Sequence, residues 1–245
     1  MEESRELPPD LLQRLRDAGP KELHELLDSY GDALDAPSAL HVLRNPHCDR
    51  QVTELLLDRN HLLRVYEVRR DLVLHRNTPE VQAVRQVPSL FWRDLARAAS
   101  DVRVRPRIRR AAEQTLGQRL PGLSLGEKVS LARVASGLLL SQLRWDPHPK
   151  VLEALLDNPR LTEGTLVPLV AKESTSGRVL TLIARNRKWG SRYEIKRSLC
   201  RNPRTPPALA LALLPSLKRN DIRAVALKPG IVEAVRRKAR ELVGM

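Results

Sequence analysis

Residues 195–214 constrain the fold most, because they read as a helix, a proline-containing corner and a second helix. Apolar residues at helical spacing lead into Asn202. The residue before a proline is disfavoured in the α conformation, so the first helix is predicted to end there. Thr205 is then expected to cap the second helix through its side-chain oxygen, with Pro206 at the first helical position. The same corner recurs along the chain, which predicts a stack of short helices.

The corners at Asn45, Asn158, Asn186 and Asn202 share small or aliphatic residues two and three positions before the asparagine. The residues that mark the corners are Asn45, Pro46, Asn77, Pro79, Asn158, Pro159, Asn186, Asn202 and Pro203. Asp49 and Thr162 are expected to cap the helices that follow their corners. The corner at Asn77 reads as contracted, with Thr78 as the cap. Asn-Pro is a common helix terminator, but the shared flanks and caps favour a repeat over coincidence.

Composition supports an all-α fold. Aromatic residues make up only 3% of the chain, and aliphatic residues supply most of its 42% hydrophobic content. Aliphatic side chains with good helix propensity favour packed helices over a β-sandwich. Residues 102–105 alternate in a strand-like way, but no second strand is evident for pairing, so we expect a helix to begin at Pro106.

Composition shifts divide the chain into four predicted regions. Residues 1–37 form an acidic N-terminal helical cap, and residues 38–115 form a first helical-repeat lobe. A connection broken by glycine and proline spans residues 116–127. A second helical-repeat lobe spans residues 128–245.

The corner Arg201-Asn202-Pro203-Arg204-Thr205-Pro206 and its echo at residues 44–46 resemble leucine-rich variant repeats, bacterial relatives of HEAT and armadillo repeats. The resemblance is best over residues 150–245, weaker over 39–100 and absent over 1–37. It implies a right-handed α-solenoid of alternating α and 3₁₀ helices, and a binding style without residue-level chemistry. The founding type of this family carries a cysteine cluster for an iron–sulfur centre. This chain has only Cys48 and Cys200, far apart, so no cofactor or metal is expected.

Charge is distributed unevenly along the chain. The net charge is +14, yet residues 1–58 hold 6 Lys and Arg against 13 Asp and Glu, whereas residues 59–245 hold 37 against 16. A body so basic attracts acidic protein surfaces or polyanions. The acidic leading segment either folds against that body and masks it or is an end repeat of different polarity.

Three basic clusters are the candidate binding surface. Each alone reads as solvated surface, but clusters at successive repeats would align into a stripe that an acidic protein or a nucleic-acid backbone would contact. The candidate residues of this basic face are Arg69, Arg70, Arg76, Arg107, Arg109, Arg110, Arg185, Arg187, Lys188, Arg192, Arg197, Arg201 and Arg204. Few aromatic residues lie between them, which argues against sequence-specific binding of single-stranded RNA.

The sequence contains no recognisable catalytic constellation. His47, His61, His75 and His148 are scattered near corners without metal-ligand spacing, and we read them as polar corner residues. Helical-repeat DNA glycosylases use similar scaffolds, so a glycosylase is a remote alternative. Flipping a base requires several aromatic side chains together, and Trp92, Trp145 and Trp189 are isolated.

The sequence therefore predicts a non-enzymatic scaffold or adaptor that binds an acidic protein partner. Binding of a DNA or RNA backbone without sequence preference is the alternative. No apolar run is long enough to span a membrane and the acidic N-terminus does not resemble a secretory signal, so a cytoplasmic location is expected.

Overall fold

The computed structural model describes residues 10–245. Residues 1–9, which belong to the predicted acidic cap, lie outside the described residues. The chain divides into two compact units, unit 1 up to Arg119 and unit 2 from Leu120 to Met245. The division falls inside the segment 116–127, where glycine and proline interrupt the helical pattern. The finer division into cap, lobes and connection stays a prediction.

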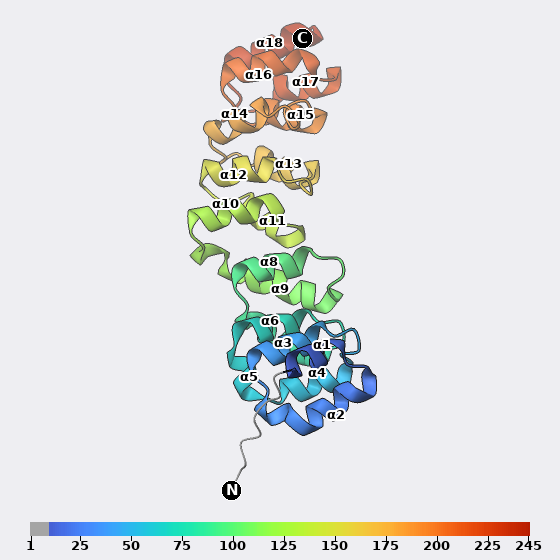
Figure 1. Ribbon diagram of the computed structural model, residues 1–245. Helices are drawn as coiled ribbons and strands as arrows, with labels where there is room; N and C mark the ends of the chain where they lie inside the picture. The colour runs from blue at the N-terminus through green and yellow to red at the C-terminus, as the bar shows by residue number, and fades with distance from the viewer. Residues whose placement is uncertain (1–9) are drawn as a thin grey trace. The chain divides into compact units, whose positions relative to one another are not determined.

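The described part of unit 1 contains helices and no strand. Its elements are α1 (Leu11–Asp17), α2 (Pro20–Tyr30), η1 (Gly31–Ala33), α3 (Ala36–Arg44), α4 (Arg50–Leu57), α5 (Asn60–Arg64), α6 (Tyr66–Leu74), α7 (Glu80–Gln86), η2 (Val87–Ser89), α8 (Trp92–Ser100) and α9 (Pro106–Arg119). Helix α1 packs against α3, α3 against α6, and α9 against α7 and α8 (Figure 1). Helix α9 begins at Pro106, and the alternating segment before it forms no strand, as expected from the sequence.

Unit 2 is also all-helical. Its elements are η3 (Leu120–Gly122), α10 (Leu125–Val134), α11 (Gly137–Leu143), α12 (Pro149–Leu156), α13 (Glu163–Ala171), α14 (Gly177–Arg185), α15 (Tyr193–Arg201), α16 (Pro207–Leu213), η4 (Leu214–Ser216), α17 (Arg219–Leu227) and α18 (Glu233–Val243). Helix α10 packs against α12, α13 against α15, and α18 against α16 and α17 (Figure 1). Among the described residues of the chain, no helix is long and apolar enough to cross a membrane. The expected cytoplasmic location stays a prediction.

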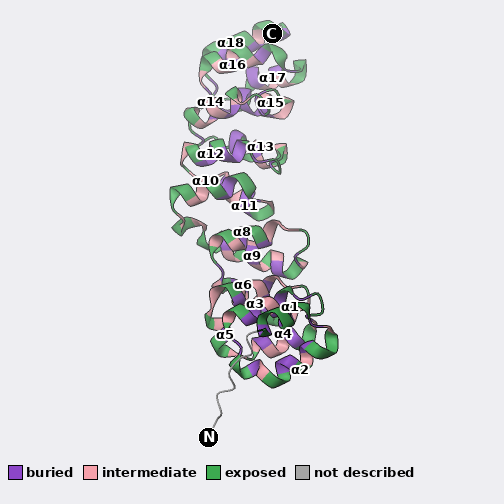
Figure 2. Cartoon of the chain, in the orientation of Figure 1, coloured by how far each residue is buried: buried purple, intermediate pink, exposed green. Residues whose placement is uncertain are grey.

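Each unit is held together by aliphatic side chains. In unit 1, one cluster of buried residues extends from Leu11 to Leu72; in unit 2, another extends from Cys200 to Val243. Buried and exposed residues occur on the same short helices, as amphipathic sequences require (Figure 2). Full burial of one Leu or Val side chain stabilises a fold by about 1.5–3 kcal/mol, so these clusters supply the main driving force.

Three buried asparagines bond helices that are distant in sequence. The side chains of Asn45, Asn158 and Asn202 are almost fully buried. Each amide nitrogen donates to two backbone carbonyl oxygens at the C-terminal end of an earlier helix. The bonds, of 2.6 to 3.0 Å, run from Asn45 to Leu15 and Ala18, from Asn158 to Ala132 and Ala135, and from Asn202 to Val170 and Lys172. The asparagines therefore satisfy carbonyl groups that the ends of α1, α10 and α13 leave without helical partners.

The same asparagines also shape their own corners. Each side-chain oxygen accepts a hydrogen bond from the backbone amide two residues later, that of His47, Arg160 or Arg204. This local bond turns the chain immediately after the helix, while the amide nitrogen contacts the neighbouring helix. One short side chain thus both ends a helix and attaches it to another.

Asn186 departs from this pattern. Its side-chain oxygen accepts local bonds from the backbone amides of Lys188 and Trp189, at 3.0 and 3.2 Å. The bond to the neighbouring helix comes instead from the indole nitrogen of Trp189, which donates to the carbonyl oxygen of Leu156 at 2.9 Å. At this corner, which lacks a proline, the buried Trp189 side chain therefore makes the bond between helices that an asparagine makes at the other corners.

The two units contain two copies of the same element order. Helices α3, α4, α6, α7, α8 and α9 each begin 127 residues before α13, α14, α15, α16, α17 and α18, and η2 precedes η4 by the same interval. Helix α5 is the exception, since the corresponding residues of unit 2 form a turn. We call residues 36–119 the first copy and residues 163–245 the second copy.

Side-chain contacts are also shared between the copies. Tyr66 donates a hydrogen bond from its hydroxyl to Asp94, and Tyr193 donates one to Asp221 at the same spacing of 28 residues. Both tyrosine hydroxyls also accept a backbone amide 25 residues later. The two copies therefore share the order of their elements and these tyrosine contacts at a constant interval of 127 residues.

Two expectations about the corners are wrong. Helix α16 begins at Pro207 with Pro206 at its N-cap, and the Thr205 hydroxyl donates instead to the carbonyl oxygen of Leu199, at the end of the preceding helix, at 2.7 Å. Thr205 is buried beside that helix end, where its hydroxyl reaches the carbonyl oxygen of Leu199, which also accepts the Asn202 backbone amide. Helix α7 likewise begins after Pro79, so Thr78 does not cap it. Asp49 and Thr162 do cap α4 and α13, as expected.

The corner at Asn77 is not contracted. Helix α6 ends at Leu74 with His75 at its C-cap, the position that Asn202 holds in the second copy. The His75 ring nitrogen Nδ1 accepts from the Asn77 backbone amide at 3.3 Å, as the asparagine oxygen does elsewhere. Asn77 itself donates to the carbonyl oxygen of Cys48 at 2.6 Å. Because a histidine and not an asparagine follows α6, a comparison of the corners by their asparagines did not align His75 with Asn202.

Replacing Asn158 by alanine tests the bonds between helices. The variant leaves the buried carbonyl oxygens of Ala132 and Ala135 without these donors, so we expect the free energy of unfolding to fall by about 2–3 kcal/mol. Urea unfolding of the full chain, followed by circular dichroism, measures the loss. Asn186→Ala is the matched control, because its bonds are local, and it should cost about 1 kcal/mol or less. Equal losses in both variants would contradict this account.

Thr205 and Thr78 provide a second test, since they occupy the same position in the two copies. Thr205→Val removes the donor to Leu199 and is expected to cost about 1–2 kcal/mol of unfolding free energy. The Thr78 hydroxyl is buried without a hydrogen-bond partner in the described part of the chain, so Thr78→Val should be neutral or stabilising. Thermal unfolding of both variants distinguishes these outcomes, and a larger loss for Thr78→Val would refute them.

Candidate functional site

The positive charge of the chain is concentrated in unit 2. Unit 2 contains 23 Lys and Arg against 10 Asp and Glu, a formal charge of +13, whereas unit 1 contains 20 against 19, a charge of +1. The acidic segment 1–58 belongs to unit 1 and balances the arginines that follow it. In unit 2 the acidic residues balance fewer than half of the cations, so a surface that attracts anions is expected there.

The predicted basic residues of unit 1 are partly engaged within the fold. Arg70 forms an ion pair with Asp71 at 2.8 Å, and Arg107 lies 3.6 Å from Glu80. Arg69 donates to the carbonyl oxygen of Leu63. The other predicted residues of unit 1 are Arg76, Arg109 and Arg110, of which Arg76 and Arg110 are exposed.

Most of the predicted basic residues of unit 2 are exposed and form no ion pair within the described residues. Arg197 pairs with Glu194 at 2.6 Å, and the Lys188 ammonium lies over the ring of Trp189. Five more are exposed and form no ion pair within residues 10–245: Arg185, Arg187, Arg192, Arg201 and Arg204. Unpaired, solvated guanidinium groups are free to contact an anionic partner.

One pocket of unit 2 gathers cations from separate elements, and we call it the basic pocket. Its volume is about 260 Å³. Val167 and Ala171 of α13 supply its apolar side, and Lys228 enters from the C-cap of α17. The remaining lining residues belong to α15: Arg197, Ser198 and Arg201.

Sequence reasoning found two of the four polar residues of this pocket. Arg197 and Arg201 were among the candidates of the basic face, but Ser198 and Lys228 were not. Lys228 follows Asn202 by 26 residues and marks a corner, which was the available signal for its position. The signal did not show that its side chain lies beside α15.

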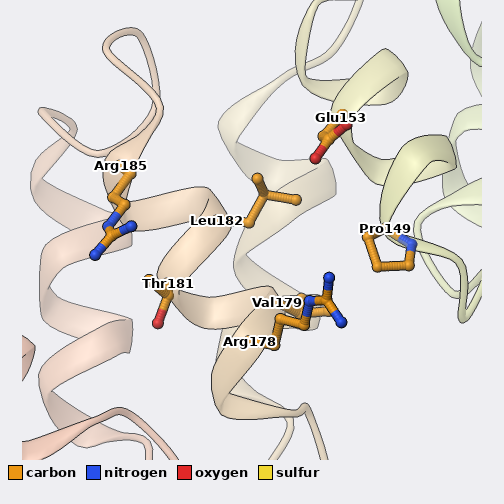
Figure 3. Close-up of a pocket in the computed structure, with 7 residues that line it drawn as sticks. All are labelled: Pro149, Glu153, Arg178, Val179, Thr181, Leu182 and Arg185. Atoms are coloured by element: carbon orange, nitrogen blue, oxygen red, sulfur yellow. The ribbon is translucent and has the colours of Figure 1, made fainter.

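A second pocket of unit 2 carries both signs of charge. It lies between α12 and α14, has a volume of about 270 Å³, and is lined on its apolar side by Pro149, Val179 and Leu182. Glu153 comes from α12, while Arg178 and Arg185 come from α14 (Figure 3). Of the predicted residues, only Arg185 lies there. Because this pocket contains a carboxylate as well as guanidinium groups, its charge does not favour an acidic ligand over a basic one.

A pocket of unit 1 surrounds one carboxylate with arginines. Arg76, Arg97 and Arg103 line it together with Asp101, and it has a volume of about 310 Å³. Hydrogen bonds from Arg103 lower the pKa of Asp101 to about 2, so this carboxylate stays ionised near neutral pH and holds Arg103.

The described residues do not assemble recognisable acid–base or metal chemistry. No group of three or more His, Cys, Asp and Glu side chains that could hold a metal lies within residues 10–245. Burial raises the pKa of the Cys48 and Cys200 thiols to about 12, so both stay protonated near neutral pH. Burial and the neighbouring arginines lower the pKa of His75, which favours its neutral form as a hydrogen-bond acceptor.

The histidines and tryptophans near the corners have local roles. His61 bonds the carbonyl oxygen of Leu34, and His148 accepts the Lys150 amide at the start of α12. Trp189 is buried, whereas Trp145 is exposed between the cations of Arg144 and Lys172. Trp92 belongs to the other unit. In unit 1, the rings of Tyr66 and Phe91 lie 4.1 Å apart between their centroids, and the Tyr66 hydroxyl donates to Asp94, so two aromatic side chains and a carboxylate lie together there.

A comparison of this chain with protein-family models, with curated proteins and with solved structures finds no match.

Proposed function

We propose that this chain is a helical-repeat solenoid of the leucine-rich variant type, and that it works as a scaffold or adaptor without catalysing a reaction. The basic surface of unit 2 binds an acidic protein partner. The observation that carries the proposal is the charge of +13 in unit 2, much of it on exposed arginines without ion pairs.

The helix pairing supports the solenoid part of the proposal. Within unit 2, α10 packs on α12 and α13 on α15, each pair separated by one intervening helix, while consecutive helices such as α17 and α18 also pack together. The asparagine bonds join the ends of these same helices. Stacked repeats contact their neighbours in this way, and they expose one extended face for binding.

The distribution of charge favours a protein partner over nucleic acid. The exposed arginines of unit 2 are interleaved with carboxylates such as Glu194 and Glu173, which pair with Arg197 and Lys228. Carboxylates on the binding face repel a continuous phosphate backbone, whereas a protein offers separated acidic groups. Few aromatic side chains are present for stacking on bases.

Neutralising exposed arginines tests the proposal. In the full chain, Arg185, Arg187, Arg192 and Arg204 are replaced together by glutamine. We expect the affinity for fluorescent polyglutamate, measured by anisotropy at low salt, to fall about tenfold or more, because each exposed charge contributes about 0.3–1 kcal/mol. Circular dichroism verifies that the variant is folded.

A matched variant of unit 1 provides the control. Arg44, Arg64, Arg85 and Arg110 are also exposed, and their replacement by glutamine removes the same charge. This control should change the affinity by about twofold or less. Equal losses of affinity in the two variants would contradict the assignment of binding to unit 2. Tighter binding to duplex DNA than to polyglutamate, with a salt dependence that indicates several phosphate contacts, would replace the protein partner by nucleic acid.

A further inference from the structure

Two of the cations that line the basic pocket form ion pairs with nearby carboxylates. Glu194 fixes Arg197 at 2.6 Å, and Glu173 fixes Lys228 at 2.9 Å. The Lys228 ammonium also donates to the carbonyl oxygen of Arg201 at 2.8 Å. A guanidinium carries five N–H donors and an ammonium three, so both cations keep donors for a ligand. The Arg201 guanidinium has no ion pair within the described residues.

Ser198 adds a neutral donor to the lining of the pocket. The residue is 8% exposed, and its hydroxyl forms no hydrogen bond to any described part of the chain. The hydroxyl oxygen itself is not fully buried, so it can donate a hydrogen bond to a ligand oxygen in the pocket. The pocket therefore combines three cations with one hydroxyl.

The first copy shows which residues the corresponding positions contain in the other unit. At the corresponding positions, Arg70 matches Arg197, but Asp71 stands for Ser198, Leu74 for Arg201 and Asp101 for Lys228. Asp71 pairs with Arg70, and Asp101 with Arg103. Leu74 and Asp101 line the arginine-rich pocket of unit 1, so the two pockets share these two positions, but the arginines near Asp101 correspond to Pro203, Ala224 and Gly230 and therefore come from different positions.

All three differences make the second copy more positive. The same helices and corners exist in both copies, so the fold itself does not require a cation at Arg201 or at Lys228. Summed over these four positions, the formal charge is −1 in the first copy and +3 in the second, which favours a ligand with concentrated negative charge.

We propose that the basic pocket binds the phosphoryl group of a phosphorylated serine or threonine on the acidic partner protein. The inference rests on the proposed function and specifies its central contact. A phosphate monoester carries a charge of about −1.5 to −2 and three acceptor oxygens, which suit three cations and a hydroxyl. A terminal phosphoryl group can also reach the buried Ser198, whereas a diester must continue along the surface on both sides.

The test compares three peptides of the same acidic sequence, with serine, phosphoserine or glutamate at the central position, by titration calorimetry with the full chain. We expect the phosphopeptide to bind about tenfold or more tightly than the serine peptide, and more tightly than the glutamate peptide. In Arg201→Leu and Ser198→Asp, which install the residues of the first copy, this preference should fall to about twofold or less. Arg223→Leu removes an exposed cation of α17 outside the pocket and should retain the preference.

Each outcome separates this inference from the proposed function. Polyglutamate binding that depends on the exposed arginines, together with no preference for the phosphopeptide, overturns the inference alone. A preference that survives in both Arg201→Leu and Ser198→Asp also overturns it, and Arg201→Leu decides alone where Ser198→Asp does not fold. An oligonucleotide with a 5′-phosphate that gains more affinity from its phosphate than the peptide does would exclude the phosphoprotein. Competition by millimolar inorganic phosphate is expected, and its absence contradicts binding at an oxyanion pocket.

Discussion

Carbonyl oxygens at the end of a helix need hydrogen-bond donors, and short helices present this need many times in one chain. Here buried asparagine side chains supply the donors for helices that are distant in sequence, as Asn158 does for Ala132 and Ala135. The same side chain turns its own corner through its oxygen. Aliphatic packing supplies most of the stabilisation, but these amide bonds determine which helix ends lie together.

The sequence predicted the helical class and the corner residues because proline and asparagine act through local backbone chemistry. It did not predict that the Thr205 hydroxyl bonds the carbonyl oxygen of Leu199 while the Thr78 hydroxyl has no partner in the described part of the chain, because the surroundings of a buried hydroxyl are set by the folded chain. The shared order of elements in the two copies was also missed. His75 and Lys172 stand where other corners have asparagine, so an alignment on asparagine alone compared positions that are not equivalent.

For the candidate site, too, the sequence predicted what depends on local composition and did not predict what depends on contacts between distant elements. Net charge and arginine clusters are properties of the sequence, and they indicated an anionic partner. The pocket depends on α13, α15 and the end of α17, which no local pattern brings together. The two copies then supply the comparison, since Arg201 and Lys228 stand at the positions of Leu74 and Asp101 on a common framework.

Hydrogen–deuterium exchange of the full chain, with and without polyglutamate, tests the central claim most directly, because it locates binding in either copy without any substitution. The account predicts slower exchange over residues 163–228 in the bound protein and unchanged exchange over the corresponding residues 36–101. Equal protection of the two segments, or protection confined to residues 36–101, would contradict the assignment of binding to unit 2.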